Sequence, residues 1–230
     1  MCIRDRTDIF AFPPGTGDAT GFIQVAESLK PYGFYGFNFI QAETRLKDYA
    51  DLVTSINPEG PYLFFGYSSG GNLAYHVARE LESRGKKVSH IVMVDSGRKL
   101  ERTPFAEEEV RKIAEEFLNH ESVSPYLTSK ILREKAYRLI QCSYAYIENS
   151  TDHHMIDADI HLVLCENSID VHRDAAGRML VSKSAWADVT RGKFETYQGS
   201  GDHIHMLDNP YLSRNVELIR RILDGARKLS

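Results

Sequence analysis

The sequence contains few cysteines and no long apolar run. Its 230 residues include 3 cysteines, Cys2, Cys142 and Cys165, an odd and widely spaced set that forms neither a disulfide framework nor a zinc site. We therefore expect reduced thiols, as in a cytoplasmic protein. No apolar run approaches the roughly 20 residues that a membrane-spanning helix needs, so the sequence predicts a soluble protein without a membrane partner.

The sequence also has no excess of positive charge. Lys and Arg number 28 against 32 Asp and Glu, for a formal net charge of −4. A mildly acidic chain without a basic cluster is a poor candidate for binding nucleic acid. With 42% hydrophobic and 26% charged residues, the chain is too apolar for intrinsic disorder. Its length fits one globular domain with a proper core.

The amino terminus shows no export signal. Residues 1–6 are polar, and no apolar segment long enough for export follows them. The first predicted strand begins almost at once, which suggests a piece excised from a longer polypeptide. Residues 1–6 are then interpreted as a remnant, and Cys2 is given no weight.

Short apolar runs alternate with helical patterns along the chain. Several runs are apolar on both faces, as in residues 91–94, which is typical of strands buried in a parallel sheet. Amphipathic helices are expected near residues 19–30, 44–56, 69–84 and 212–228. The alternation predicts an α/β fold with right-handed crossovers. The predicted strands are 9–12, 34–39, 62–65, 88–94, 160–165 and 193–197.

Residues 98–157 interrupt this alternation, because their sequence pattern predicts helices and no strand. Thr103 and Pro104 resemble a helix start, with Thr as the cap and Pro at the first helical position. A second helix is expected from Thr128 through Tyr146. The segment is either a lid over a site or a plain crossover, and crossovers of this length are uncommon. We therefore expect a single domain with a core of residues 7–97 and 158–230 and a helical lid at about 98–157.

The motif that carries chemistry is Gly66-Tyr67-Ser68-Ser69-Gly70, which fits the G-x-S-x-G nucleophile elbow. Such a serine stands on a strained turn between a strand and a helix, and glycine two residues to either side avoids a collision. The helix after the turn directs its amino-terminal N–H groups at the site, where they stabilise the negative charge that develops during reaction. A predicted strand before the motif and a helix after it are the confirming context. The alternative is a Gly- and Ser-rich turn without chemistry.

A serine nucleophile needs a base and an acid. His203 and His205 compete as the base in the loop before the last helix, and His203 is preferred because it lies nearer the glycine turn. Asp95 ends a predicted strand, at the same sheet edge as Ser68. Its role would be to orient the imidazole and stabilise its charged form. Glu166 and Asp170 follow a later strand, and from position alone they remain rivals of Asp95.

The oxyanion hole is expected to use two backbone N–H groups. One belongs to Ser69, directly after the nucleophile, and the other to a loop after an early strand. In the loop at 12–17 two prolines lack donors, so Gly15 offers the first N–H after them. The same glycines are not a phosphate-binding loop, because no Lys follows at the required spacing.

Together these residues resemble the thioesterase domains that terminate nonribosomal peptide synthetases, with those that release surfactin and fengycin most alike. The resemblance covers nearly the whole chain, and Ser69 departs from it because alanine is more usual there. It implies an α/β-hydrolase fold with Ser68, Asp95 and His203 as the triad and Gly15 and Ser69 as oxyanion donors. Its markers are residues 12–15, 58–62, 66–74, 92–96 and 201–207.

The resemblance also implies a reaction and a partner. An upstream peptidyl carrier domain presents a peptidyl thioester on its 4′-phosphopantetheine arm, and Ser68 takes over the peptide, which leaves as a macrocycle or a linear acid. No metal site and no bound cofactor are expected in the domain itself. The alternatives are a free-standing type II thioesterase that hydrolyses wrongly loaded carriers, and a catalytically inactive carrier-docking module.

Overall fold

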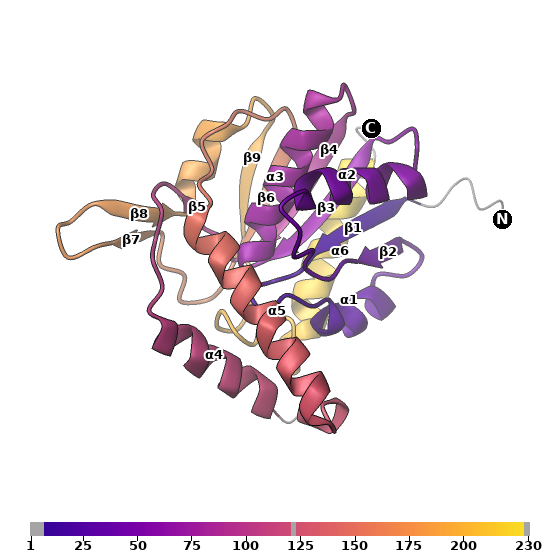
Figure 1. The fold of residues 1–230 in the computed structure, drawn as a ribbon. Coiled ribbons are helices and arrows are strands. Elements are labelled where there is room, and N and C mark those ends of the chain that lie inside the picture. Colours follow the sequence, from indigo (N-terminus) through magenta and orange to yellow (C-terminus); the bar gives the residue numbers. More distant parts are fainter. Residues whose placement is uncertain (1–6, 121–122, 228–230) are drawn as a thin grey trace.

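In the computed structural model, which describes residues 7–120 and 123–227, six parallel strands form one central sheet (Figure 1). The prediction of an α/β-hydrolase fold is confirmed. All the predicted strands are present, although the one expected at 34–39 ends at Gly36. The suggestions about residues 1–6 and Cys2 lie outside the described residues. The strands, in sheet order, are β2 (Gly33–Gly36), β1 (Asp8–Phe12), β3 (Tyr62–Tyr67), β4 (Val88–Val94), β6 (Asp159–Leu164) and β9 (Phe194–Gln198).

Helices cover both faces of this sheet because its strands carry apolar side chains on both faces. In β3, Tyr62 and Phe64 pack with α2 (Arg45–Ile56) and α3 (Ser69–Ser83). Leu63 and Phe65 of the same strand pack on the other face, with α1 (Ile23–Ser28) and α6 (Leu212–Arg227). Successive side chains of a strand point to opposite faces. One strand therefore contributes to two hydrophobic cores.

The segment between β4 and β6 contains two long helices, α4 (Glu107–Asn119) and α5 (Lys130–Asn149), joined through the short helix η3 (Ser124–Tyr126). The two long helices pack on each other through Ala114, Leu118 and Ile140. In Figure 1 α4, in maroon, lies below the central sheet, and α5, in red, runs diagonally from near β5 to the bottom of the view.

Three details of this segment differ from the sequence-based expectation. It is not helix only, because β5 (Arg98–Lys99) pairs antiparallel with β8 (Met179–Ser182), which pairs in turn with β7 (Val171–Arg173). Strands this short carry no readable periodicity. Thr103 and Pro104 do not start a helix: α4 begins at Glu107, where three glutamates in the first turn complement the helix dipole. The cap of α5 is Ser129, not Thr128, and its hydroxyl accepts the N–H of Leu132.

Two further elements complete the described chain. The short helix η2 (Thr20–Phe22) leads into α1, and η4 (Ser184–Val189) follows β8 and buries Trp186 and Val189. Among the described residues, no helix is long and apolar enough to cross a membrane.

A buried aspartate ties the end of the α4–α5 segment to the core. Asp152 is 0% exposed. Its Oδ2 accepts from the Asn72 side chain in α3 and from the backbone N–H of Lys99 in β5, each at 2.6 Å. Its Oδ1 lies 2.9 Å from His76 Nε2. One carboxylate therefore connects α3, β5 and the chain that leaves α5.

We expect Asp152→Ala to lower the free energy of unfolding by about 3 kcal/mol, because it leaves buried donors of Asn72 and Lys99 without an acceptor. Urea denaturation measures this change. Asp51→Ala is the matched control, since it removes an exposed carboxylate that pairs with Arg84 and should cost less than about 1 kcal/mol. Equal losses in the two variants would contradict the anchoring role of Asp152.

Candidate active site

The turn at Ser68 has the geometry that the motif predicts. Ser68 lies between β3 and α3 with φ 54° and ψ −128°, a conformation that costs a non-glycine residue of order 1–3 kcal/mol. A Cβ atom on Gly66 would lie 2.4 Å from the backbone of Gly70, and one on Gly70 would lie 2.4 Å from the carbonyl oxygen of Phe12. Glycine at both places therefore lets strand, turn and helix pack tightly around the serine.

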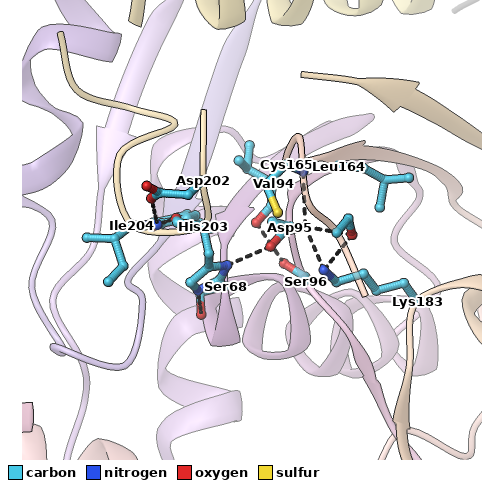
Figure 2. A network of polar contacts seen from close by, with 12 residues as sticks. Ser68, Val94, Asp95, Ser96, Leu164, Cys165, Lys183, Asp202, His203 and Ile204 are labelled. Carbon is cyan, nitrogen blue, oxygen red and sulfur yellow. Dashed lines mark hydrogen bonds and ion pairs between the residues drawn. The ribbon is translucent and has the colours of Figure 1, made fainter. Parts of the chain in front are cut away.

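Three of the predicted side chains meet at the carboxyl edge of the sheet (Figure 2). His203 Nε2 lies 3.1 Å from Ser68 Oγ, and His203 Nδ1 lies 2.7 Å from Asp95 Oδ2. Ser68 follows β3, Asp95 follows β4, and His203 lies in the loop after β9. Because parallel strands end at the same edge, three positions spread over 136 residues share one site.

The Asp95 carboxylate is buried and fully engaged. Its side chain is 2% exposed. While Oδ2 faces His203, Oδ1 accepts from Lys183 Nζ at 2.7 Å and from the Cys165 N–H at 3.2 Å. Burial alone would raise the pKa of Asp95, but the hydrogen bonds from His203, Lys183 and Cys165 outweigh it and hold this pKa well below its usual range. The carboxylate is therefore ionised at neutral pH.

Lys183 is a residue of this site that the sequence did not reveal. Its ammonium group lies 2.7 Å from Asp95 Oδ1 and 2.7 Å from Ser168 Oγ, and the residue is 8% exposed. It stands between β8 and η4, 88 positions from Asp95. No motif marks a lysine at that distance, because only the packing of the β7–β8 hairpin brings it to the carboxylate.

The loop that carries His203 is held from two sides. The Tyr67 hydroxyl donates to the backbone carbonyl of His203. From α6, the Asn215 side chain donates to the carbonyls of Ser200 and Met206 at 2.8 and 2.7 Å and accepts the N–H of Ser200 at 2.8 Å. Asn215 is 1% exposed. In the sequence, the only sign of this contact between α6 and the His203 loop was a polar residue, Asn215, on the apolar face of an amphipathic helix.

The rival residues lie elsewhere. His205 is exposed, and its ring pairs with Asp202 at 2.8 Å. Asp170 accepts the backbone N–H groups of Lys183 and Ser184 at 2.8 and 2.7 Å and so caps η4. Glu166 is exposed. The structure therefore brings Asp95 to His203, and it does not bring Glu166 or Asp170 there.

The loop after β1 lies directly against the start of α3. Gly15 is part of a turn closed by the hydrogen bond from Gly17 N–H to Pro14 O at 2.9 Å, and Ser69 is the first residue of α3. Helix α5 covers this loop: a Cβ atom on Gly15 would lie 3.2 Å from the Tyr144 ring, and one on Gly17 would lie 2.8 Å from Leu139. The loop at Gly15 and Gly17 thus lies beneath side chains of α5, and the backbone of Ser69 directly follows Ser68.

The described residues contain one group with the spacing of metal ligands, and it is not at this edge. It consists of His90, Asp159 and His161, which lie toward the other end of the sheet.

Comparison with known proteins finds the same family by sequence and by structure. The family model described as "Thioesterase domain" matches residues 7–224. Bacitracin synthase 3 of Bacillus licheniformis is 33% identical over 227 residues, which cover 96% of this chain and 3% of that protein. Surfactin synthase subunit 3 of Bacillus subtilis (strain 168) is 32% identical over 216 residues, which cover 94% of this chain and 16% of that protein.

A solved structure agrees with these relatives. The thioesterase domain that cyclises the lipopeptide antibiotic surfactin superposes with a TM-score of 0.84 at 31% identity, covering 96% of this chain and 93% of that chain. The chain spans only 3% to 16% of the length of the first curated relatives it matches. The resemblance to thioesterase domains of peptide synthetases is thereby confirmed.

We expect Gly66→Ala to lower the free energy of unfolding by about 2–3 kcal/mol, because the new methyl group would overlap backbone that cannot move aside. Gly225→Ala is the matched control: this glycine lies in α6, and a methyl group added to it would meet nothing within 4 Å. Its replacement should stabilise the helix by about 0.5–1 kcal/mol. Urea denaturation of both variants tests the tight turn, and a stabilised Gly66→Ala variant would contradict it.

Proposed function

The chain belongs to the thioesterase domain family, and we propose that it transfers a peptidyl chain from a carrier thioester to Ser68 and then releases it. The observation that carries this proposal is the line of hydrogen bonds from Ser68 Oγ through His203 to Asp95, at 3.1 and 2.7 Å. In this proposal Ser68 is the nucleophile, His203 the base and Asp95 the acid that orients the imidazole.

The first half of the reaction follows from these positions. His203 Nδ1 donates to Asp95, so Nε2 is free to accept the hydroxyl proton of Ser68. Ser68 Oγ then attacks the thioester carbonyl, and the backbone N–H groups of Gly15 and Ser69 are proposed to hold the oxyanion. When the C–S bond breaks, the thiol leaves with the proton from His203, and the peptide remains as an ester on Ser68.

The second half decides the product. An amine or hydroxyl of the bound peptide gives a macrocycle, whereas water gives a linear acid. We assign residues 98–157 as the lid of a single domain whose core is 7–97 and 158–230. The contacts of Leu139 and Tyr144 with the loop at Gly15 and Gly17 support this assignment. Phe105 packs edge-on against Tyr144 at 5.1 Å. An apolar cover of this kind restricts water and favours cyclisation.

The partners follow from the substrate. We infer that the peptide arrives on the 4′-phosphopantetheine arm of a peptidyl carrier domain within a nonribosomal peptide synthetase, and that the arm is substrate and not a resident cofactor. The relatives named above are far longer than this chain, which supports a place inside a larger synthetase.

Incubation with a peptidyl thioester mimic, followed by intact-protein mass spectrometry, tests the proposal. We expect an acyl adduct on the wild-type chain and none on Ser68→Ala, with turnover reduced at least about 10³-fold. Adduct formation on Ser68→Ala would contradict the assignment of the nucleophile. Ser69→Ala is the matched control, since it keeps the backbone N–H and should still form the adduct.

Two alternatives give different results in the same assay. A type II thioesterase would hydrolyse short acyl carriers faster than peptidyl carriers. An inactive docking module would react neither with the mimic nor with a serine-directed fluorophosphonate probe.

The ion pair between Lys183 and Asp95 predicts a shift in pH dependence. We infer that Lys183 is a positioning residue, whose positive charge offsets the carboxylate that faces His203. In Lys183→Met the imidazolium of His203 would face an uncompensated carboxylate and so hold its proton more strongly. Because the base must be unprotonated, the acidic limb of the pH profile of kcat/KM should move upward by about one pH unit.

Lys183→Arg provides the control for this shift, because it retains the charge and should keep the acidic limb within a few tenths of a pH unit of the wild type. A purely structural role for Lys183 would lower activity at every pH without moving the limb. That result would remove Lys183 from the proposed machinery.

A further inference from the structure

A second polar cluster lies on the α6 face of the sheet, away from the Ser68 elbow. The strand register aligns His90 with Asp159 and His161 with Glu195, and residues two apart along a strand share a face. His90 precedes Asp95 by five residues, so the cluster lies about 16 Å from the site at the carboxyl edge. The cluster consists of His90 in β4, Asp159 and His161 in β6, and Glu195 and Tyr197 in β9.

Three atoms of this cluster have the spacing of metal ligands. His90 Nδ1 lies 3.2 Å from His161 Nε2 and 3.6 Å from Asp159 Oδ2, and all three ligand atoms lie within 4.8 Å of one another. Zinc–nitrogen bonds of 2.0–2.1 Å in tetrahedral geometry place neighbouring ligand atoms about 3.3 Å apart. The two separations from His90 Nδ1 are close to that value.

Neighbouring groups hold two of these ligands in place. His161 Nδ1 lies 3.2 Å from the Tyr197 hydroxyl, and that hydroxyl donates to Glu195 Oε2 at 2.5 Å. Asp159 Oδ1 accepts the backbone N–H of Lys193 at 2.7 Å, so Oδ2 is the oxygen that faces His90. Outer hydrogen bonds of this kind orient the rings and carboxylates that bind metals in proteins.

One nitrogen of each imidazole faces the other ring, with His90 Nδ1 and His161 Nε2 3.2 Å apart. On the far sides, the His90 ring bonds to the backbone of Ala226 and His161 Nδ1 lies 3.2 Å from the Tyr197 hydroxyl. A neutral imidazole has one proton to donate. When each ring donates its proton on the far side, the two facing nitrogens both present lone pairs, which is the form that binds a metal ion.

The surroundings of the two imidazoles favour a divalent cation. His90 and His161 are 5% and 7% exposed. A carboxylate oxygen lies 3.6 Å from each ring, that of Asp159 from His90 and that of Glu195 from His161. A divalent ion is stabilised by such carboxylates, and it binds neutral imidazole directly.

We propose that His90 Nδ1, His161 Nε2 and Asp159 Oδ2 bind one Zn²⁺ ion. Two nitrogens and one carboxylate oxygen form a donor set that zinc accepts, with the fourth position left for water. A cleft of about 460 Å³ borders two of the three ligands, His90 and Asp159, and is also lined by Glu82, Lys87 and Asp157. The sequence predicted no metal here, since the two histidines are 71 residues apart and match no metal-binding spacing.

Zinc titration of the chelator-treated chain tests the proposal directly. Calorimetry and elemental analysis after gel filtration should show one zinc per chain, and added zinc should raise the unfolding temperature. Asp159→Asn keeps the shape of the side chain and its bond to Lys193 while removing the charge, and it should weaken zinc binding by roughly 10-fold or more. His90→Asn should abolish binding, and circular dichroism of both variants checks that they fold.

The matched control replaces His153 and His154 with Asn. These adjacent histidines are exposed, so they are the alternative place for a surface-bound ion, and their loss should leave the affinity unchanged. Three results would overturn the proposal: no zinc retained by the wild type, equal affinity in Asp159→Asn, or loss of binding in the His153/His154 variant. Anomalous diffraction at the zinc edge would locate the ion between β4 and β6.

Discussion

The buried carboxylate of Asp95 is the point at which three distant parts of the chain meet. One oxygen faces His203, and the other accepts from Lys183 and from the backbone N–H of Cys165. A charge that is 2% exposed is tolerable only when such partners surround it. The same bonds that make its burial possible also fix the orientation of the imidazole toward Ser68. The stability of this part of the fold and the geometry proposed for catalysis therefore rest on one group.

The parallel sheet explains why the Asp95 carboxylate can both stabilise this part of the fold and orient His203. Strands β3, β4 and β9 end at one edge, so a turn residue after each of them reaches a common space. The elbow at Ser68 is tight because Gly66 and Gly70 leave room for backbone contacts. The loop at Gly15 rests on the start of α3, and α5 closes over it. The tight packing around this edge gives Ser68, the proposed nucleophile, a fixed and partly covered position.

The two clusters of titratable groups occupy separate regions of the sheet. At the carboxyl edge, a lysine and a histidine surround one buried carboxylate. Toward the other end, two histidines lie beside an aspartate, and one nitrogen of each ring faces the other ring. Apolar residues of β4 and β6 fill the space between them. The proposed zinc ion would thus join β4 to β6 without touching the machinery around Ser68, so the two proposals stand independently.

Local patterns in the sequence determined the α/β class, the six central strands, the elbow at Ser68 and the choice of His203 over His205 as the residue in the glycine turn. These features depend on neighbours within a few residues, which a sequence displays. Between Asp95, Glu166 and Asp170, position alone left the question open. Only the tertiary structure brought Asp95 to His203, Lys183 to Asp95, and His90 to His161. Those pairs are 71 to 108 residues apart, and strand register and loop packing, which no short pattern records, decide whether they meet.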